Sequence, residues 1–200
     1  MVRVQEVHAL EPGGIYAVSD STVELDDVEL LPVRGDWALY AEDSVIDGIG
    51  VRTQFDAAGT YQGMIYTDEL VFPPSVQLQE SVLFGDGGVT FGQSGSGAPI
   101  LAQGGQLGLA STTLTYAAAG PVPAIEQASG NVTTVFGSLI DRPGAGPGTC
   151  MFAGNFSGTN THVLSTWMPD TMMVTAACGG SPPNTFDLLD SGPTGPANLN

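Results

Sequence analysis

Lysine is absent from this 200-residue chain, and basic residues of any kind are rare. Four arginines stand against 21 acidic residues, so the formal net charge is −17 at pH 7. Proteins that bind nucleic acids neutralise phosphates with clustered lysines and arginines, and this chain has no such cluster. The composition therefore predicts no nucleic-acid partner.

Long apolar runs are also missing. No stretch approaches the ~18 continuous apolar residues that a membrane-spanning helix needs. Residues 1–7 alternate in the manner of a β-strand and do not form the apolar core of a secretory signal. We therefore expect no membrane insertion and no signal peptide.

Cysteine and histidine are too few for a zinc site. The chain has Cys150, Cys178, His8 and His162, and the cysteines are not in a Cys-x-x-Cys arrangement. The glycines at 85–88 lack a lysine that would meet a phosphate, so a nucleotide-binding loop is not expected. The sequence predicts no metal and no cofactor. The two cysteines are compatible with one disulfide bond or with a reduced pair.

Glycine and proline, in contrast, are abundant. The 28 glycines and 14 prolines lie between short apolar runs without a fixed period. This pattern is typical of an all-β protein and predicts an antiparallel β-sandwich or barrel. Expected strands include 22–31, 63–72, 76–84 and 131–140. Residues 98–102 and 106–115, on either side of Gln103-Gly104-Gly105, are expected to form a β-hairpin.

The chain also divides by composition. We expect a main β domain over residues 1–140, a Gly/Pro linker over 141–148, and a small β subdomain with an extended C-terminal arm over 149–200. Residues 1–91 hold 16 of the 21 acidic residues. The weakly charged remainder indicates either a hydrophobic core or a surface that other protein covers.

An acidic run lies near the N-terminus: Asp20, Glu24, Asp26, Asp27 and Glu29. Carboxylates at this density could bind calcium. The apolar residues that alternate with them instead favour a strand whose acidic side faces water. A carbohydrate- or calcium-binding β-module nevertheless stays open as a functional hypothesis, besides the two that are given below.

A glycine-rich turn surrounds Ser96, and two apolar segments follow it. This arrangement resembles the nucleophile turn of trypsin-like serine peptidases. The segment that starts at Asp36 with Asp-Trp-Ala-Leu is similar to the segment that carries the buried aspartate of that family, and His8, Asp36 and Ser96 follow the family order. The resemblance covers residues 1–128. It implies Ser96 as the nucleophile, His8 as the general base and Asp36 as the acid that orients the histidine.

Two alternatives to this catalytic interpretation remain open. Ser94 competes with Ser96 for the role of nucleophile, since it stands in the same glycine turn. The turn is equally compatible with a purely structural role. A trypsin-like serine peptidase, active or inactive, is therefore the alternative function.

The leading functional hypothesis is a structural subunit of a large assembly. Low charge, absent lysine and abundant Gly, Thr, Ser and Ala are the composition on which it rests. The concrete expectation is a virus or bacteriophage virion component: a capsid, decoration, spike or tail protein. Its partners would be copies of itself and other assembly subunits, and it would be located in the virion after assembly in the host cytoplasm.

Overall fold

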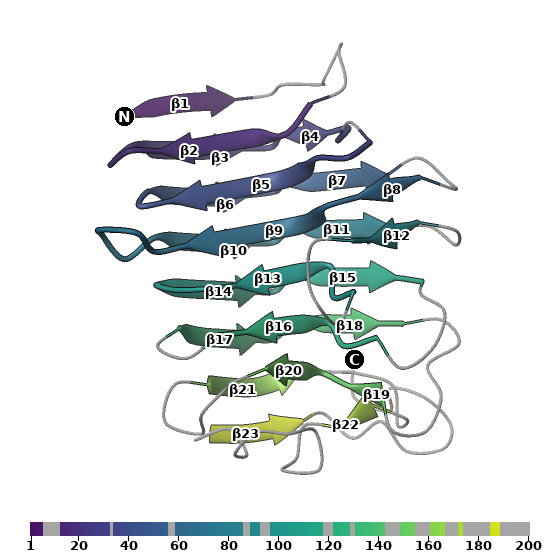
Figure 1. Ribbon diagram of the computed structural model, residues 1–200. Coiled ribbons are helices and arrows are strands. Elements are labelled where there is room, and N and C mark those ends of the chain that lie inside the picture. Colours follow the sequence, from purple (N-terminus) through teal and green to yellow (C-terminus); the bar gives the residue numbers. More distant parts are fainter. Residues whose placement is uncertain are drawn as a thin grey trace.

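The chain folds as a β-solenoid in the computed structural model, with strands stacked in parallel coils (Figure 1). The structure describes residues 1–5, 13–32, 34–55, 59–85, 89–92, 97–117, 122–128, 131–142, 149–154, 161–166, 172–173 and 185–188. Every described regular element is a β-strand, so the all-β prediction is confirmed. Every described strand pair is parallel, so the antiparallel sandwich or barrel is wrong.

Sheet A forms one side of the solenoid and has one strand from each coil. Paired residues lie from 21 positions apart (Val2 and Val23) to 31 positions apart (Ser75 and Gln106). In spatial order its strands are β1 (Val2–Gln5), β3 (Thr22–Asp26), β6 (Val45–Ile49), β10 (Ser75–Gln79), β14 (Gln106–Ala110), β17 (Val132–Phe136), β21 (Thr161–Thr166) and β23 (Thr185–Leu188).

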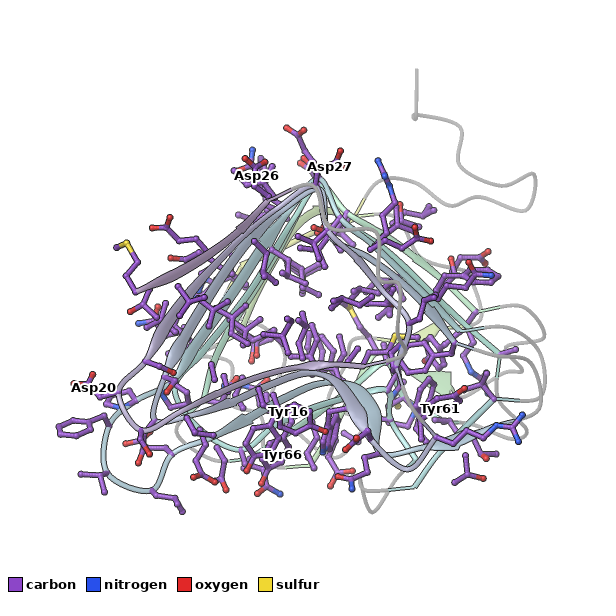
Figure 2. All side chains as sticks on the ribbon, turned by 90° about the horizontal axis from the view of Figure 1, so that it is seen from above. Tyr16, Asp20, Asp26, Asp27, Tyr61 and Tyr66 are labelled. Carbon is purple, nitrogen blue, oxygen red and sulfur yellow. The ribbon has the colours of Figure 1, made fainter. Side chains whose placement is uncertain are left out.

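Sheets B and C form the other two sides of a triangular cross-section (Figure 2). Sheet B contains β18 (Leu139–Asp141), β15 (Thr113–Tyr116), β11 (Val82–Gly85), β7 (Arg52–Phe55) and β4 (Glu29–Leu30). Sheet C contains β2 (Ile15–Val18), β5 (Trp37–Glu42), β9 (Gly63–Asp68), β13 (Ile100–Ala102), β16 (Ile125–Gln127) and β20 (Phe152–Gly154). Two small sheets pair β12 (Thr90–Phe91) with β8 (Thr60–Tyr61), and β19 (Thr149–Cys150) with β22 (Met172–Met173).

The interior is built from rows of apolar side chains, one from each coil. Alternate residues of a strand point inward, and in-register pairing places equivalent residues of successive coils on top of one another. In sheet C one inward row is buried from Leu39 onward and contains Leu39, Ile65, Ile100, Ile125 and Phe152. A single strand could not bury such a row, because its partners come from the coils above and below.

A one-residue corner joins sheets A and B in the same way in successive coils. Its residue has a positive φ, and a buried residue follows it. The left-handed conformation turns the chain within one residue, so the inward alternation restarts on the next side. The corner residues are Asp27, Gly50, Glu80, Ser111 and Gly137.

Buried hydroxyl groups follow this corner and replace hydrogen bonds that the bend interrupts. The Ser81 hydroxyl donates to the Gln79 carbonyl at 2.8 Å and accepts from the Val51 N–H at 3.1 Å. In later coils Ser138 accepts from the Thr112 N–H and donates to the Phe136 carbonyl. The A/B corner is therefore held together from coil to coil, since a buried backbone group without a partner is costly.

The corner between sheets C and A varies in length. Two residues, Asp43 and Ser44, join β5 to β6, whereas six residues, 69–74, join β9 to β10. Three residues, 103–105, join β13 to β14. The predicted hairpin over 98–115 is thus wrong: its arms belong to sheets C and A, and each pairs with strands of neighbouring coils.

Strands β20 and β21 extend sheets C and A beyond the predicted linker, by pairing with β16 and β17. Residues 143–148 of that linker lie outside the described residues, and the predicted division of the chain stays a prediction. Cys150 is disulfide-bonded, while Cys178 lies outside the described part of the chain. The described residues include no helix with the length and apolar character to cross a membrane.

Candidate functional site

Of the predicted catalytic residues, only Asp36 falls within the described chain; His8, Ser94 and Ser96 lie outside it. Asp36 stands just before β5, half-buried, and its carboxylate accepts a hydrogen bond from the Tyr16 hydroxyl. The Tyr16 hydroxyl in turn accepts from the Trp37 N–H at 3.2 Å. Asp36 therefore holds the Tyr16 side chain in place on the outer face of sheet C. The triad of His8, Asp36 and Ser96 stays a prediction.

A ladder of three tyrosines lies on the outer face of sheet C, where Figure 2 shows Tyr16 and Tyr66. Tyr16, Tyr40 and Tyr66 are in register on successive strands, so each ring lies over the next. Ring centroids are 5.2 Å apart for the first pair and 5.0 Å for the second, with planes 24° apart in both pairs. Trp37 continues the cluster, with its ring centroid 5.0 Å from that of Tyr66.

Carboxylates accept hydrogen bonds from all three phenols. Tyr40 donates to Glu42 at 2.7 Å, and Tyr66 donates to Asp68 at 3.0 Å. Partial burial, and then the bonded carboxylate, raise the pKa of Tyr16 and of Tyr40 to about 12 and raise that of Tyr66 further. The phenols stay protonated donors at physiological pH, which suits a fixed hydrogen-bonded surface and not a proton-transferring group.

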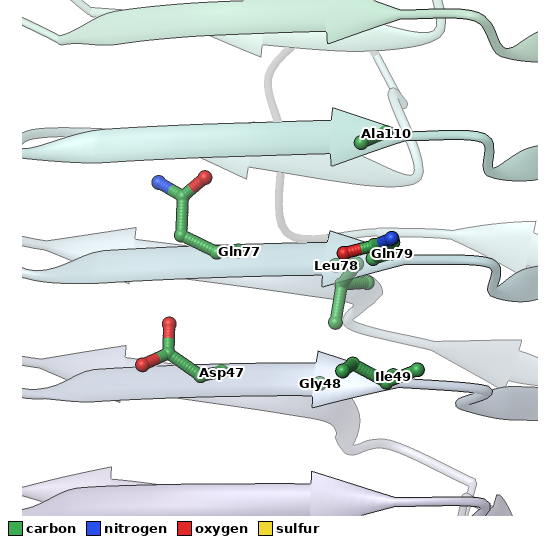
Figure 3. Close-up of a pocket in the computed structure, with 7 residues that line it drawn as sticks. All are labelled: Asp47, Gly48, Ile49, Gln77, Leu78, Gln79 and Ala110. Carbon is green, nitrogen blue, oxygen red and sulfur yellow. The ribbon is translucent and has the colours of Figure 1, made fainter.

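A shallow acidic groove runs along the outer face of sheet A. Asp47 and Gln77 project from the same side of neighbouring strands (Figure 3). Glu24 occupies the same register position on the preceding strand. Residues lining the groove are Glu24, Leu25, Asp26, Asp47, Gly48, Ile49, Gln77, Leu78, Gln79 and Ala110.

Stacking places Glu24 and Asp47 one strand apart with like charge. Desolvation and then the charge of Glu24 raise the pKa of Asp47 above its usual range. Such a pair could accept hydrogen bonds from hydroxyl or amino groups of a ligand. Within the described residues, no three His, Cys, Asp or Glu side chains are grouped to bind a metal ion.

Exposed apolar side chains are the other feature of the outer surface. Ile49, Val132 and Phe136 stand on sheet A, and Val82 and Phe84 stand on sheet B. Three more, Leu70, Val71 and Phe72, are consecutive in the long C/A corner. Strand alternation points the five residues on sheets A and B away from the filled interior, so they belong to the outer surface and not to the core.

No protein-family model, curated protein or solved structure matches this chain.

Sequence reasoning missed both the tyrosine ladder and the apolar corner. The ladder was readable as an internal repeat: Ile-Tyr-Ala-Val at 15–18, Leu-Tyr-Ala-Glu at 39–42 and Ile-Tyr-Thr-Asp at 65–68. The apolar corner was readable as Leu-Val-Phe before two prolines, but it was included in an expected strand. Only the coil geometry shows that these three residues leave the sheet.

Proposed function

We propose that this protein is a structural subunit of a large protein assembly, of the kind found in a virion as a capsid, decoration, spike or tail component. In this role the solenoid is a rigid body that other subunits contact. Copies of this chain and other assembly subunits are its partners. It acts by burying its outer surfaces against them, without turnover of a substrate.

The observation that carries the proposal is the set of large apolar side chains exposed on two sheets and one corner of a filled solenoid. Ile49 and Phe136 on sheet A are about half exposed, and Phe84 lies on sheet B. Monomeric proteins rarely expose contiguous apolar patches, and residues 70–72 form such a run, whereas surfaces that become buried on association are rich in large apolar and aromatic side chains.

Regular corners support the same role. The A/B corner repeats with a residue of positive φ from Asp27 to Gly137, and buried hydroxyls connect successive coils. In a solenoid each coil contacts only its neighbours, so such coil-to-coil bonds make the body stiff along its length. A stiff body can present contact surfaces at fixed spacings to several partners.

Sedimentation velocity of the purified full-length chain tests the proposal. We expect association that increases over the micromolar range and a far-ultraviolet spectrum of β-structure throughout. A chain that stays monomeric at all concentrations, alone and with extracts of its source, would contradict it. The peptidase alternative has its own test, which is labelling of Ser96 or Ser94 by a fluorophosphonate.

A further inference from the structure

We propose that the tyrosine ladder of sheet C is a site of oxidative cross-linking, at which a one-electron oxidant joins Tyr40 to Tyr66 by a carbon–carbon bond. The product is a dityrosine between two successive coils. Its oxidant is a strong one-electron acceptor, for example the ferryl heme of a peroxidase. The reaction occurs within a single chain, so it does not depend on the association proposed above.

Access separates the ladder from the other tyrosines. All five tyrosines of the chain lie in the described residues. Tyr16 is 45% exposed, and Tyr40 and Tyr66 are half-buried, whereas Tyr61 and Tyr116 are 1% and 0% exposed. An oxidant in solution therefore reaches the ladder and not the other two phenols.

The two reacting phenols already have acceptors for the protons that they must lose. A phenol keeps its proton at physiological pH, but once it gives up an electron it becomes a strong acid, and a base within hydrogen-bond reach can take the proton. Tyr40 donates to Glu42 at 2.7 Å. The Tyr66 hydroxyl lies 3.0 Å from Asp68 and 3.1 Å from the Gln103 side-chain oxygen, and of these two acceptors the carboxylate is the base.

Tyr116 has the opposite surroundings. Its hydroxyl donates to the Val122 carbonyl at 3.1 Å, and a backbone carbonyl is too weak a base to take the proton of an oxidised phenol. The Arg142 guanidinium lies 5.8 Å from the centre of the Tyr116 ring and disfavours a further positive charge there. Both burial and environment thus keep Tyr116 reduced.

Register places the two reacting rings alongside each other. Tyr40 and Tyr66 are paired on β5 and β9, and their acceptors Glu42 and Asp68 are paired two residues further on. The ring centroids are 5.0 Å apart, with planes 24° apart. Because each hydroxyl points to the carboxylate two positions ahead on its own strand, the two hydroxyls and the ring carbons next to them lie on the same side of the ladder.

Tyr16 belongs to the same ladder, but its hydroxyl points the other way. Its ring centroid is 5.2 Å from that of Tyr40. Its hydroxyl donates to Asp36 and accepts from the Trp37 N–H, and both residues lie at the start of β5. The Tyr40 hydroxyl points toward the end of β5 instead, so the carbons that couple are kept apart in this pair.

The reaction consists of two one-electron steps followed by coupling. The oxidant takes one electron from each ring, and the phenolic protons pass to Glu42 and Asp68. The two phenoxyl radicals then pair their electrons in a bond between the ring carbons ortho to the two oxygens. Each of these carbons loses its hydrogen as a proton while each oxygen regains one, so the product is lighter than the starting chain by two hydrogen atoms.

This bond would connect β5 to β9 covalently. It closes the loop from residue 40 to residue 66, which is one complete coil. A covalent link between distant residues restricts the unfolded chain, so the cross-link would stabilise the solenoid against separation of these two coils.

Photo-oxidation of the wild-type chain by ruthenium tris(bipyridine) and persulfate tests the assignment. The photo-oxidised complex is a cationic one-electron oxidant, which suits a chain with a net charge of −17. We expect dityrosine fluorescence in the monomer band of a denaturing gel. Mass spectra of a proteolytic digest should contain a linked pair of peptides, one with Tyr40 and the other with Tyr66.

Variants identify the rings and the proton acceptors. Tyr40→Phe and Tyr66→Phe should each lower the yield of monomeric dityrosine about tenfold or more, because one of the two phenols is gone. Tyr16→Phe is the matched control: it removes the most exposed phenol of the ladder and keeps its ring, and it should change the yield less than about twofold. Glu42→Gln combined with Asp68→Asn keeps the hydrogen-bond acceptors but removes the bases, so the initial rate should fall about tenfold or more. Circular dichroism spectra should match that of the wild type in every case.

Several results would overturn the assignment. They are dityrosine that occurs only in cross-linked dimers, a yield that is undiminished in Tyr40→Phe or Tyr66→Phe, and a rate that is unchanged in the carboxylate variant. Absence of dityrosine from the folded chain, under conditions that convert a tyrosine-containing peptide, would overturn it as well. The sedimentation test of the proposed function is independent of all these results, so either proposal can fail while the other stands.

Discussion

The two corners that flank sheet A are built on opposite plans. At the A/B corner successive coils turn through one residue of positive φ, from Asp27 to Gly137, and side chains of several kinds are accepted there. At the C/A corner the length changes from coil to coil, and one coil carries three exposed apolar residues, Leu70, Val71 and Phe72. This difference indicates that the A/B corner stabilises the solenoid, whereas the C/A corner tolerates changes in length and sequence.

Gly105→Ala should have the largest effect, because it disturbs the C/A corner at its tightest point. A Cβ at Gly105 would lie 1.9 Å from the Pro74 carbonyl oxygen, and φ is +67°. Strain and the forced shift should lower the free energy of unfolding by about 3 kcal/mol. Urea denaturation measures this directly.

Gly137→Ala is the matched control at the A/B corner. Its φ is also positive, +55°, but the nearest atom to an added Cβ is the Ser111 hydroxyl at 3.8 Å. Only the backbone strain remains, so we expect a loss of about 1 kcal/mol. Equal losses at the two glycines would show that the close approach to Pro74 adds nothing to the backbone strain at Gly105.

Ser81→Ala should break the hydroxyl ladder of the A/B corner. The Val51 N–H would lose its acceptor in a buried position, and this should lower the free energy of unfolding by about 1–2 kcal/mol. Ser75→Ala, whose hydroxyl accepts from the Gln77 amide on the outer face, should change it by less than about 0.5 kcal/mol. Thermal unfolding of both variants measures the two losses in stability.

Asp43→Ala should release residues 70–72 without unfolding the solenoid, because the Asp43 carboxylate accepts hydrogen bonds from the N–H groups of Leu70, Val71 and Phe72. The three N–H donors lower the pKa of the Asp43 carboxyl, so its stabilising effect exists above the ordinary pKa and is lost as the pH falls through the folded-state value. We expect faster proteolysis within 69–74 at pH 7 and a smaller difference from wild type in strong acid. Limited proteolysis at both pH values checks this. Cleavage at unchanged rates would show that the Asp43 carboxylate does not hold this segment in place.

Asp47→Asn should give the smallest effect, and it should stabilise. The raised pKa means that the ionised carboxyl opposes folding, so its favourable contribution is complete below the ordinary pKa and disappears as the pH rises through the folded-state value. At pH 7 we expect a gain of about 0.3 kcal/mol, with none near pH 3. Glu24→Gln should relieve the same repulsion, and the double variant should add little.

Strand positions were largely readable from the sequence, but strand pairing was not. The expected strands 22–31, 76–84 and 131–140 each contain a corner, at Asp27, Glu80 and Gly137. Apolar alternation is a local signal that restarts after one left-handed residue, so each pair of strands looked like one strand. Pairing instead depends on residues 21 or more positions away, which local turn signals cannot report.

The two candidate surfaces also differ in how far the sequence predicts them. Stacked tyrosines follow from a repeat in the sequence, once coils rather than hairpins are assumed. The exposure of Leu70, Val71 and Phe72 required the structure, because these residues have the composition of a buried strand. They lie in water because sheet C strand β9 ends at Asp68 and because the carboxylate of Asp43 holds their backbone outside the sheet.

Hydrogen exchange of the wild-type chain, compared between dilute and associated samples, tests most directly whether the exposed apolar side chains form the contact surface. We predict slower exchange on association in at least one of the peptides that cover 69–74, 82–85 and 132–136, with no change in a peptide that covers the A/B corner at 111–112. Protection gained only at the A/B corner would contradict the burial of apolar surface on association.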